Sequence, residues 1–480
     1  MGSLFRQVRR PGVPVLFTLL VLAAAGCASS HHAAAPSTEP APATLTPPKP
    51  PKPPKQPKPS WVRVFVFDGD RGKPVRGAVV RVDGHPGYTS RIGRARILLP
   101  HRGRLVVTVT RRGYDAFRQR IQFTNRPLRV VRVYQTSTQW TMYGASPQRT
   151  QVNPSIRLRP PFKVVWSAPT GALIEFPAVV YQRVAYVTNA RASIRAYSMK
   201  DGTPLWRNDR PSGMMAASPA VVGRELVVHG MDGNVWVLNR FNGKVLWRYR
   251  TGSSIESSPV VIDGVDYFGN WGGTVYALNL RTHRALWTYR SGYKITSSAS
   301  YMNGTVFIGD YGGRLLALGA RTGRLHWSSS VNGRIYGTPA VASGRVFVPS
   351  SDGNTMTAFT TRGHRLWTIN TGAYVYSSPA VWNGRVYFGS YNGDLYCVSA
   401  ESGRILWRFS TAGSIQGAPT IVDGIVYFAN RQHRIYGANA LTGRQVFRFP
   451  DGDFVPVSGN GDRLLLHGFS RLYAVVPKRR

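Results

Sequence analysis

The 480-residue sequence is poor in cysteine and in acidic residues, and each shortage excludes a class of protein. With only Cys27 and Cys397, neither a disulfide framework nor a Cys/His zinc site is expected. Asp and Glu number 21 against 62 Lys and Arg, a formal net charge of +41. Such a surface attracts polyanions, including nucleic acid, anionic lipid and acidic wall polymers. Because the arginines are scattered, an ordinary solvated surface is the alternative interpretation.

Catalytic motifs are also missing. The sequence contains no nucleophile elbow, phosphate-binding loop or metal-binding helix motif, and no specific nucleic-acid motif. Many of its few carboxylates directly precede Gly, as in Asp201-Gly202 and Asp352-Gly353, which is ordinary turn chemistry. No catalytic residue, metal ligand or cofactor is therefore predicted.

One apolar run stands near the start, from Val13 to Ala25, after the basic residues Arg6, Arg9 and Arg10. It is short for a membrane span and typical of a secretory signal, here residues 1–26. The following Gly26-Cys27 resembles a bacterial lipobox, although Ala24 stands where Leu is usual, and this resemblance implies lipid attachment at Cys27. Ordinary signal cleavage and an uncleaved anchor are the alternatives. All three place the rest of the chain outside the cytoplasm, and lipid attachment predicts that it is anchored to the membrane, in the periplasm or at the cell surface.

Residues 27–60 contain too few large apolar side chains to form a core. Their end repeats lysine every third residue, which matches the three-residue turn of polyproline II and aligns four ammonium groups along one edge. These are the predicted polyanion contacts Lys49, Lys52, Lys55 and Lys58. The simpler alternative is a stiff spacer.

From residue 61 to 135 the apolar residues alternate at period two between Gly and Pro turns, which predicts antiparallel strands. The run Pro74 to Ala78, Leu98-Leu99-Pro100 and Gly113-Tyr114 resemble the carboxypeptidase-regulatory-like (transthyretin-like) sandwich. That resemblance implies a non-catalytic spacer or adhesion domain.

After a lead-in at 136–162, a unit of about 40 residues recurs through 163–480. Seven tryptophans mark it: Trp166, Trp206, Trp247, Trp287, Trp327, Trp367 and Trp407. Phe447 takes the eighth place. Each unit holds four β-runs joined by turns such as Asn383-Gly384 and Asn392-Gly393, which predicts a β-propeller.

The repeat contains three sequence motifs in order: Ser-Ser-Pro-x-Val, Gly-x-Val-Tyr-Phe-Gly and Thr-Gly-x-x-Leu-Trp. This pattern resembles the pyrroloquinoline-quinone (PQQ)-type propeller repeat. The resemblance implies that each Trp packs between neighbouring blades. Three strands follow Phe447 without a fourth, so we expect Lys163–Ala168 to complete an eighth blade. A seven-bladed ring is the alternative.

Variable positions lead into each first strand. Counted three places back from Pro or its equivalent, the column is Ile174, Ala216, Glu256, Thr296, Tyr336, Tyr376 and Gln416; five places back it includes Lys294, Arg334 and Tyr374. The residues in these two columns vary between repeats, whereas the residues around them are nearly the same in every repeat. The innermost strands begin here, so these side chains should surround the mouth of the central channel. We predict a partner-binding rim there, because Tyr and Arg anchor many interfaces: Glu256, Lys294, Arg334, Tyr336, Tyr374, Tyr376 and Gln416. Drift at exposed positions is the alternative.

Signal, spacer and propeller together resemble the bacterial outer-membrane-assembly propeller lipoproteins. The resemblance implies a monomeric, non-catalytic scaffold for an envelope protein or an anionic envelope polymer. The alternative function is a PQQ-dependent oxidoreductase, but the adjacent cysteines of that enzyme class are missing from this sequence.

Overall fold

The computed structural model describes residues 59–101, 103–123 and 128–478. Their regular structure is β-strand apart from one 3-10 turn, η1 (Thr136–Thr138), so the prediction of an all-β chain is confirmed. Within these ranges no helix has the length and apolar character to cross a membrane. The predicted signal peptide, Cys27, and Lys49, Lys52, Lys55 and Lys58 lie outside the described residues.

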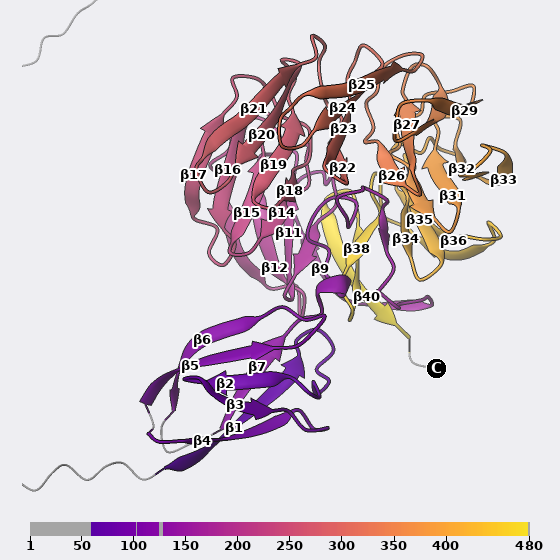
Figure 1. Ribbon diagram of the computed structural model, residues 1–480. Helices are drawn as coiled ribbons and strands as arrows, with labels where there is room; N and C mark the ends of the chain where they lie inside the picture. The colour runs from indigo at the N-terminus through magenta and orange to yellow at the C-terminus, as the bar shows by residue number, and fades with distance from the viewer. Residues whose placement is uncertain (1–58, 102, 124–127, 479–480) are drawn as a thin grey trace, which may run out of the picture. The chain divides into compact units, whose positions relative to one another are not determined.

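The N-terminal domain has two sheets that share one hydrophobic core. Apolar and polar residues alternate along its strands, so one face of each sheet is buried; in β5 this face carries Leu105, Val107 and Val109. The sheet orders are β4-β1-β7 and β3-β2-β5-β6 (Figure 1). The strands are β1 (Ser60–Asp68), β2 (Val79–Val82), β3 (His85–Tyr88), β4 (Arg94–Leu99), β5 (Gly103–Thr110), β6 (Phe117–Phe123) and β7 (Leu128–Val133). The transthyretin-like assignment of this domain stays a prediction.

The repeat region folds into successive sheets whose strands pair in chain order. The first four are β10 (Val179–Tyr181), β11 (Val184–Thr188), β12 (Ile194–Ser198), β13 (Pro204–Asn208); β14 (Ala220–Val222), β15 (Glu225–His229), β16 (Asn234–Asn239), β17 (Val245–Arg250); β18 (Val260–Ile262), β19 (Val265–Gly269), β20 (Thr274–Asn279), β21 (Arg284–Arg290); and β22 (Ser300–Met302), β23 (Thr305–Gly309), β24 (Arg314–Gly319), β25 (Leu325–Ser330). The next three are β26 (Ala340–Ala342), β27 (Arg345–Ser350), β28 (Thr355–Thr360), β29 (Arg365–Asn370); β30 (Ala380–Trp382), β31 (Arg385–Gly389), β32 (Asp394–Ser399), β33 (Ile405–Ser410); and β34 (Thr420–Val422), β35 (Ile425–Asn430), β36 (Arg434–Asn439), β37 (Gln445–Phe449).

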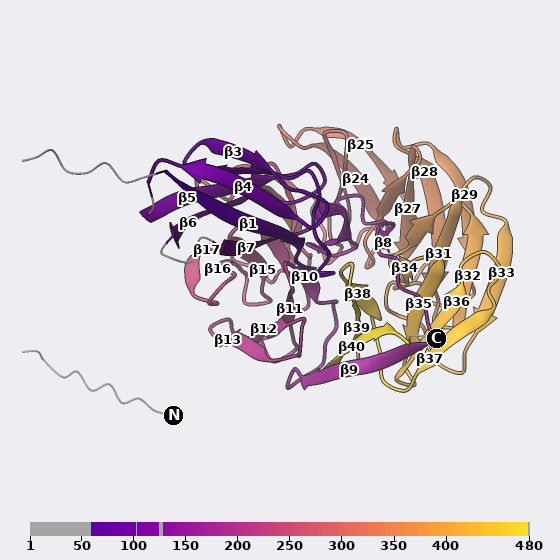
Figure 2. The same cartoon turned by 90° about the horizontal axis from the view of Figure 1, so that it is seen from below.

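The last sheet combines both ends of the repeat region. Strands β38 (Val457–Gly459), β39 (Leu464–His467) and β40 (Arg471–Pro477) pair in order, and β9 (Phe162–Pro169) joins β40 antiparallel. Figure 2 shows the magenta β9 beside the yellow β40. Innermost strands of most consecutive sheets contact one another, as β10 does β14 and β26 does β30, and β10 of the first sheet also contacts β38 of the last. The first and last sheets are therefore neighbours.

Burial falls from the inner to the outer strands of each sheet. In β19 four of five residues are buried, because neighbouring sheets cover both faces, whereas in the outer strand β21 buried positions give way to strict alternation of exposed and partly buried residues. A β-bulge recurs between third and fourth strands, for example at Ala277/Leu278. Cys397 is a free cysteine buried in β32, as its apolar strand predicts.

The lead-in segment runs along the inner edges of the innermost strands. Trp140 bridges to Val180 of β10, and β8 (Val152–Asn153) pairs parallel with β34. Between these points, carbonyl groups of the segment accept backbone hydrogen bonds of 2.8–3.0 Å from β14, β22, β26, β30 and β34. The segment therefore occupies the channel at the level of these strands.

Arg149 holds the middle of this segment in place. Its side chain is completely buried, and its guanidinium donates hydrogen bonds to the carbonyl oxygens of Tyr143, Ser258, Pro259 and Ala299. Two of these carbonyls come from the loop before β18 and one from the loop before β22. One buried cation thus ties the lead-in to two sheets through charge-assisted hydrogen bonds.

The repeated serines connect one sheet to the next. The backbone N–H of Ser218 donates to the Ser258 hydroxyl at 3.0 Å, and Ser258 N–H donates to Ser298 in the same way at 2.8 Å. The series continues from Ser298 to Thr338 and from Thr338 to Ser378. Each bond spans 40 residues, so a hydroxyl at this position of the Ser-Ser-Pro motif satisfies the neighbouring repeat's buried N–H.

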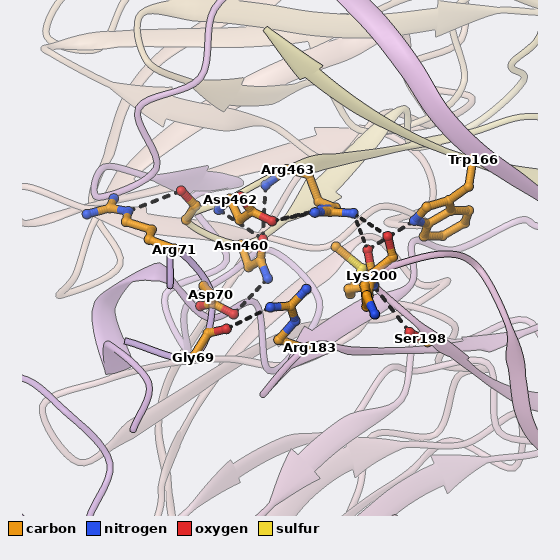
Figure 3. Close-up of polar contacts among 12 residues, drawn as sticks. Gly69, Asp70, Arg71, Trp166, Arg183, Ser198, Lys200, Asn460, Asp462 and Arg463 are labelled. Atoms are coloured by element: carbon orange, nitrogen blue, oxygen red, sulfur yellow. Dashed lines mark hydrogen bonds and ion pairs between the residues drawn. The ribbon is translucent and has the colours of Figure 1, made fainter. Parts of the chain in front are cut away.

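Polar contacts connect the N-terminal domain to the last sheet (Figure 3). The Arg71 Nε–H donates to the carbonyl oxygen of Gly461 at 3.2 Å, and the Asn460 side-chain amide donates to Asp70 at 2.9 Å. From the first sheet, the Arg183 guanidinium donates to the Gly69 carbonyl oxygen at 3.0 Å. The loop after β1 is thus held by both sheets that meet at β10 and β38.

Candidate functional site

The loops before the innermost strands border a cavity of about 280 Å³ in the channel. Four predicted rim residues line it together: Glu256, Tyr336, Tyr376 and Gln416. Tyr143 of the lead-in also lines it, with its hydroxyl donating to Ser378 Oγ at 3.1 Å. Since the lead-in fills the channel beside Tyr143, the cavity is a blind pocket.

One wall residue, Glu175, is absent from the rim that the sequence predicts. Counting back from Pro177 aligns Ile174 with Glu256, but the backbone places Ile174 level with Ile255. The Ile174 N–H donates a backbone hydrogen bond to a loop of the neighbouring sheet, as the Ile255 N–H does. Leu173 O accepts a backbone hydrogen bond from the loop after the second strand of its own sheet, and Ser254 O accepts the equivalent bond in its repeat. The first repeat therefore has one residue fewer before Pro, and its rim residue is Glu175. Since Leu173 and Ile174 are both apolar, the sequence pattern gives no signal of this shift.

Glu256 is the most constrained rim residue, with a side chain only 7% exposed. Tyr336 donates its hydroxyl hydrogen to Oε1, and the Trp271 indole N–H donates to Oε2 at 3.0 Å. Burial raises the pKa of the Glu256 carboxyl, and the hydrogen bonds from Tyr336 and Trp271 oppose this rise. Glu256 is thus nearly completely buried and belongs to the pocket wall.

Tyrosines form a second wall. Tyr376 lies 5.0 Å from Tyr336 and 5.1 Å from Tyr391 between ring centroids, and Tyr374 lies 5.6 Å from Tyr391. Tyr374 is 46% exposed, whereas Tyr336 and Tyr376 are partly buried. Tyr391 follows β31 and so comes from a part of the repeat outside the predicted rim. Burial raises the pKa of Tyr376 and Tyr391, which therefore remain neutral at physiological pH.

The two predicted basic rim residues lie beside the pocket but do not line it. Lys294 Nζ is 3.3 Å from the centroid of the Trp271 ring, close enough for a cation–π interaction. Partial burial lowers the Lys294 pKa, while the Glu256 carboxylate raises it. Arg334 is exposed and forms an ion pair with Asp352 at 3.2 Å. Its charge is thus already neutralised at the mouth.

Glu175 differs from the other carboxylates of the pocket. It makes no hydrogen bond or ion pair with any described residue, and burial raises its pKa to about 7, with Glu256 and Asp453 adding to the rise. Asp453 in contrast has Arg431 at 3.1 Å. Glu175 is therefore a partly buried carboxyl with no counter-charge among the described residues.

The seven tryptophans lie at the junctions between sheets. Six indole N–H groups donate to a carbonyl of the next repeat, as Trp287 does to Ala320 at 2.8 Å and Trp367 to Ala400 at 3.2 Å; the others are Trp166, Trp206, Trp327 and Trp407. A Cβ added to Gly323 would lie 2.6 Å from the Trp287 ring, so Gly is needed against the indole. Trp247 has no partner for its N–H in the described structure and stacks on His283 at 4.2 Å.

The pocket does not suit a bound quinone cofactor. Within residues 59–101, 103–123 and 128–478, no three His, Cys, Asp or Glu side chains are grouped to hold a metal ion. PQQ itself carries carboxylate groups, and this pocket presents Glu175 and Glu256 rather than cations. Like charges brought together in a buried site repel, so no step through such a cofactor follows from these residues.

These features define the chain as a PQQ-type repeat protein of propeller architecture with a blind pocket in its channel. The family model described as outer membrane protein assembly factor BamB matches residues 162–288, 271–374 and 361–475, which is more than half of the chain. The chain therefore belongs to the BamB family.

Two curated relatives are both named outer membrane protein assembly factor BamB. The protein from Alkalilimnicola ehrlichii is 31% identical over 116 residues, covering 21% of this chain and 29% of the relative. The protein from Pseudomonas aeruginosa is 30% identical over 87 residues, covering 18% and 23%. The matches thus span less than a third of either relative.

Solved structures show the same fold. BamB from Moraxella catarrhalis matches with a TM-score of 0.57 and 17% identity, over 66% of this chain and 98% of its own. Quinohemoprotein alcohol dehydrogenase from Comamonas testosteroni matches with a TM-score of 0.61 and 13% identity, over 72% and 81%. At these identities the likeness shows the fold alone.

Proposed function

We propose that this chain is a non-catalytic scaffold of the cell envelope, an eight-bladed propeller whose channel mouth binds a protein partner. The observation that carries the proposal is the tyrosine-rich pocket, where side chains that differ between repeats converge on an otherwise regular frame. Membership of the outer membrane protein assembly factor BamB family supports a binding role. Cys27 as the lipid attachment site and the 27–60 spacer would hold the propeller at the membrane, in the periplasm or at the cell surface.

Tyr374 is the residue best placed to contact a partner. It is 46% exposed and lies against Tyr376 and Tyr391, so its ring extends the aromatic surface from the pocket to solvent. Arg334 occupies the equivalent position of the preceding repeat and is exposed as well. Rigid aromatic side chains next to Arg are frequent anchors of protein interfaces.

The test is photo-crosslinking in cells. A photoreactive amino acid replaces Tyr374 in one strain and Leu366 in a second, because Leu366 is 43% exposed on the outer strand β29. We expect a discrete crosslinked protein from position 374 and none from 366, and Arg334→Ala with Tyr374→Ala should abolish partner capture with little change in Tm. Equal crosslinking from both positions, or capture that persists in the double variant, would contradict the channel-mouth site.

An anionic envelope polymer is the other ligand that the charge of +41 favours. The salt dependence of binding distinguishes such a polymer from a protein partner. Retention of the protein on purified wall material should fall steeply with ionic strength and should not depend on Tyr374. The enzyme alternative is tested by titrating the purified protein with PQQ and calcium and following dye reduction. Any turnover would overturn the non-catalytic proposal.

A further inference from the structure

One of the carboxylates at the pocket has no positive charge paired with it among the described residues. Three carboxylates lie in or beside it: Glu256 has hydrogen-bond donors with Lys294 nearby, and Asp453 has Arg431. Only Glu175 has no donor or counter-ion among the described residues. Arg334, at the mouth, is exposed, pairs with Asp352 through its Nε and does not line the pocket.

The walls around Glu175 are suited to a cation that carries carbon. Six aromatic side chains line the cavity: Tyr143, Phe176, Tyr336, Tyr376, Tyr391 and Phe454. Aromatic faces attract ammonium and guanidinium groups, and the attraction grows when water is excluded. A divalent metal ion would need several oxygen ligands instead, and the described residues contain no cluster of three or more His, Cys, Asp or Glu side chains that could hold one.

Polar groups without partners are also present on the wall. Thr296 is 4% exposed and lines the cavity, and its hydroxyl, which lies near Tyr311, has no partner of good hydrogen-bond geometry among the described residues. Gln416 lines the cavity as well and makes no side-chain hydrogen bond with a described residue. A buried hydroxyl left unpaired is costly, so these groups indicate a ligand with hydrogen-bonding capacity of its own.

We propose that the pocket binds an organic cation, an alkylammonium or guanidinium group that pairs with Glu175 and lies against the tyrosine wall. This inference rests on the proposed function in taking the same channel site, and it names the chemistry recognised: a Lys or Arg side chain of the partner, or a free amine of the same kind. In a protein with so large an excess of basic residues, the pocket provides a local anionic site for a cationic group.

Calorimetric titration of the purified full chain tests this. The probes are a blocked pentapeptide with a central Arg among glycines, its citrulline counterpart, which is uncharged but of similar shape, and agmatine. We expect the Arg peptide or agmatine to bind and the citrulline peptide to bind at least about tenfold more weakly, since a buried ion pair is lost. Binding of the peptide indicates a side-chain ligand, and binding of agmatine alone indicates a free amine. Equal binding of the Arg and citrulline peptides, or no binding of any probe, overturns the proposal.

Matched variants separate recognition from folding. Glu175→Gln should weaken binding by about tenfold or more, whereas Glu401→Gln, an exposed carboxylate outside the pocket, should bind as the wild type does. Affinity should also fall between pH 8 and pH 6 as Glu175 gains a proton, with Glu256, Asp453, Lys294 and Arg431 as the neighbouring charges. Unchanged affinity in Glu175→Gln contradicts the proposal even if partner crosslinking at position 374 succeeds, so the two proposals can fail independently.

Discussion

Asn460 and Asp70 are 390 residues apart in the chain, and the Asn460 side-chain amide donates a hydrogen bond of 2.9 Å to the Asp70 carboxylate. Gln139 donates a second bond to Asp70 at 2.7 Å, from the start of the lead-in segment. Figure 3 shows the contact between Asp70 and Asn460. Asp70 is 4% exposed, so a buried carboxyl links the N-terminal domain, the lead-in and the last sheet. The stability of this junction should therefore depend on pH.

Burial raises the pKa of Asp70 from 3.8 to about 6, so the folded chain holds this proton more tightly than the unfolded chain. Stability from this group is complete below pH 3.8 and is lost as the pH rises through 6. Asp70→Asn cannot ionise, so its Tm relative to wild type should rise between pH 4 and pH 7 by a few degrees, equivalent to at most about 3 kcal/mol. Thermal unfolding at several pH values measures this, with Glu401→Gln as an exposed control. A constant Tm difference would contradict it.

Arg149→Met should strongly destabilise the propeller. Methionine fills much of the same space but leaves the carbonyl groups of Tyr143, Ser258, Pro259 and Ala299 without their buried donor. Each lost partner costs about 1–3 kcal/mol, so we expect a total above 3 kcal/mol and a clear fall in Tm. Arg157→Met is the control, since Arg157 follows in the same segment but is 69% exposed in an ion pair with Asp423. Similar losses in both variants would contradict the role of Arg149.

Two tryptophans offer a matched comparison. Trp287→Phe removes the hydrogen bond to Ala320, whereas Trp247→Phe removes none, because its indole N–H has no partner in the described structure. Both changes replace an indole with the smaller phenyl ring at the same position of the repeat. We therefore expect Trp287→Phe to cost about 1 kcal/mol more in the free energy of unfolding. Denaturant unfolding of the two variants gives the difference, and a larger cost at Trp247 would contradict the prediction.

Glu175→Gln should stabilise the protein at alkaline pH. Burial raises the Glu175 pKa from 4.5 to about 7, so the folded state favours the protonated carboxyl and loses stability as the pH rises from 4.5 through 7. The Gln variant removes this loss, and its Tm should exceed that of the wild type at pH 8 but not at pH 4.5. Thermal unfolding in the absence of added amines measures the effect. A variant that is less stable at pH 8 would show that Glu175 has a stabilising partner after all.

The sequence pattern predicted the all-β architecture because both of its signals are local. Period-two alternation gives strands such as β5, and Gly turns at fixed spacing give the joints between them. The partner-binding rim stays a prediction. Four of its residues, Glu256, Tyr336, Tyr376 and Gln416, line one pocket, whereas the other three, Lys294, Arg334 and Tyr374, are not part of its lining. Glu175 was missed through a one-residue shift, and Tyr391 because it follows the second strand of its repeat rather than preceding the first.

The repeated residues by themselves determined the strands, their order and the spacing of the tryptophans, since each depends on side chains within about 40 positions of one another. Only the tertiary structure decided what those strands enclose. It bonded Arg149 to carbonyls more than 100 residues away, brought Glu175 and Glu256 to the wall of one pocket, and joined Asp70 to Asn460. Such relationships arise when the first and last sheets meet, because distances across the channel depend on packing among all the sheets and not on any single repeat.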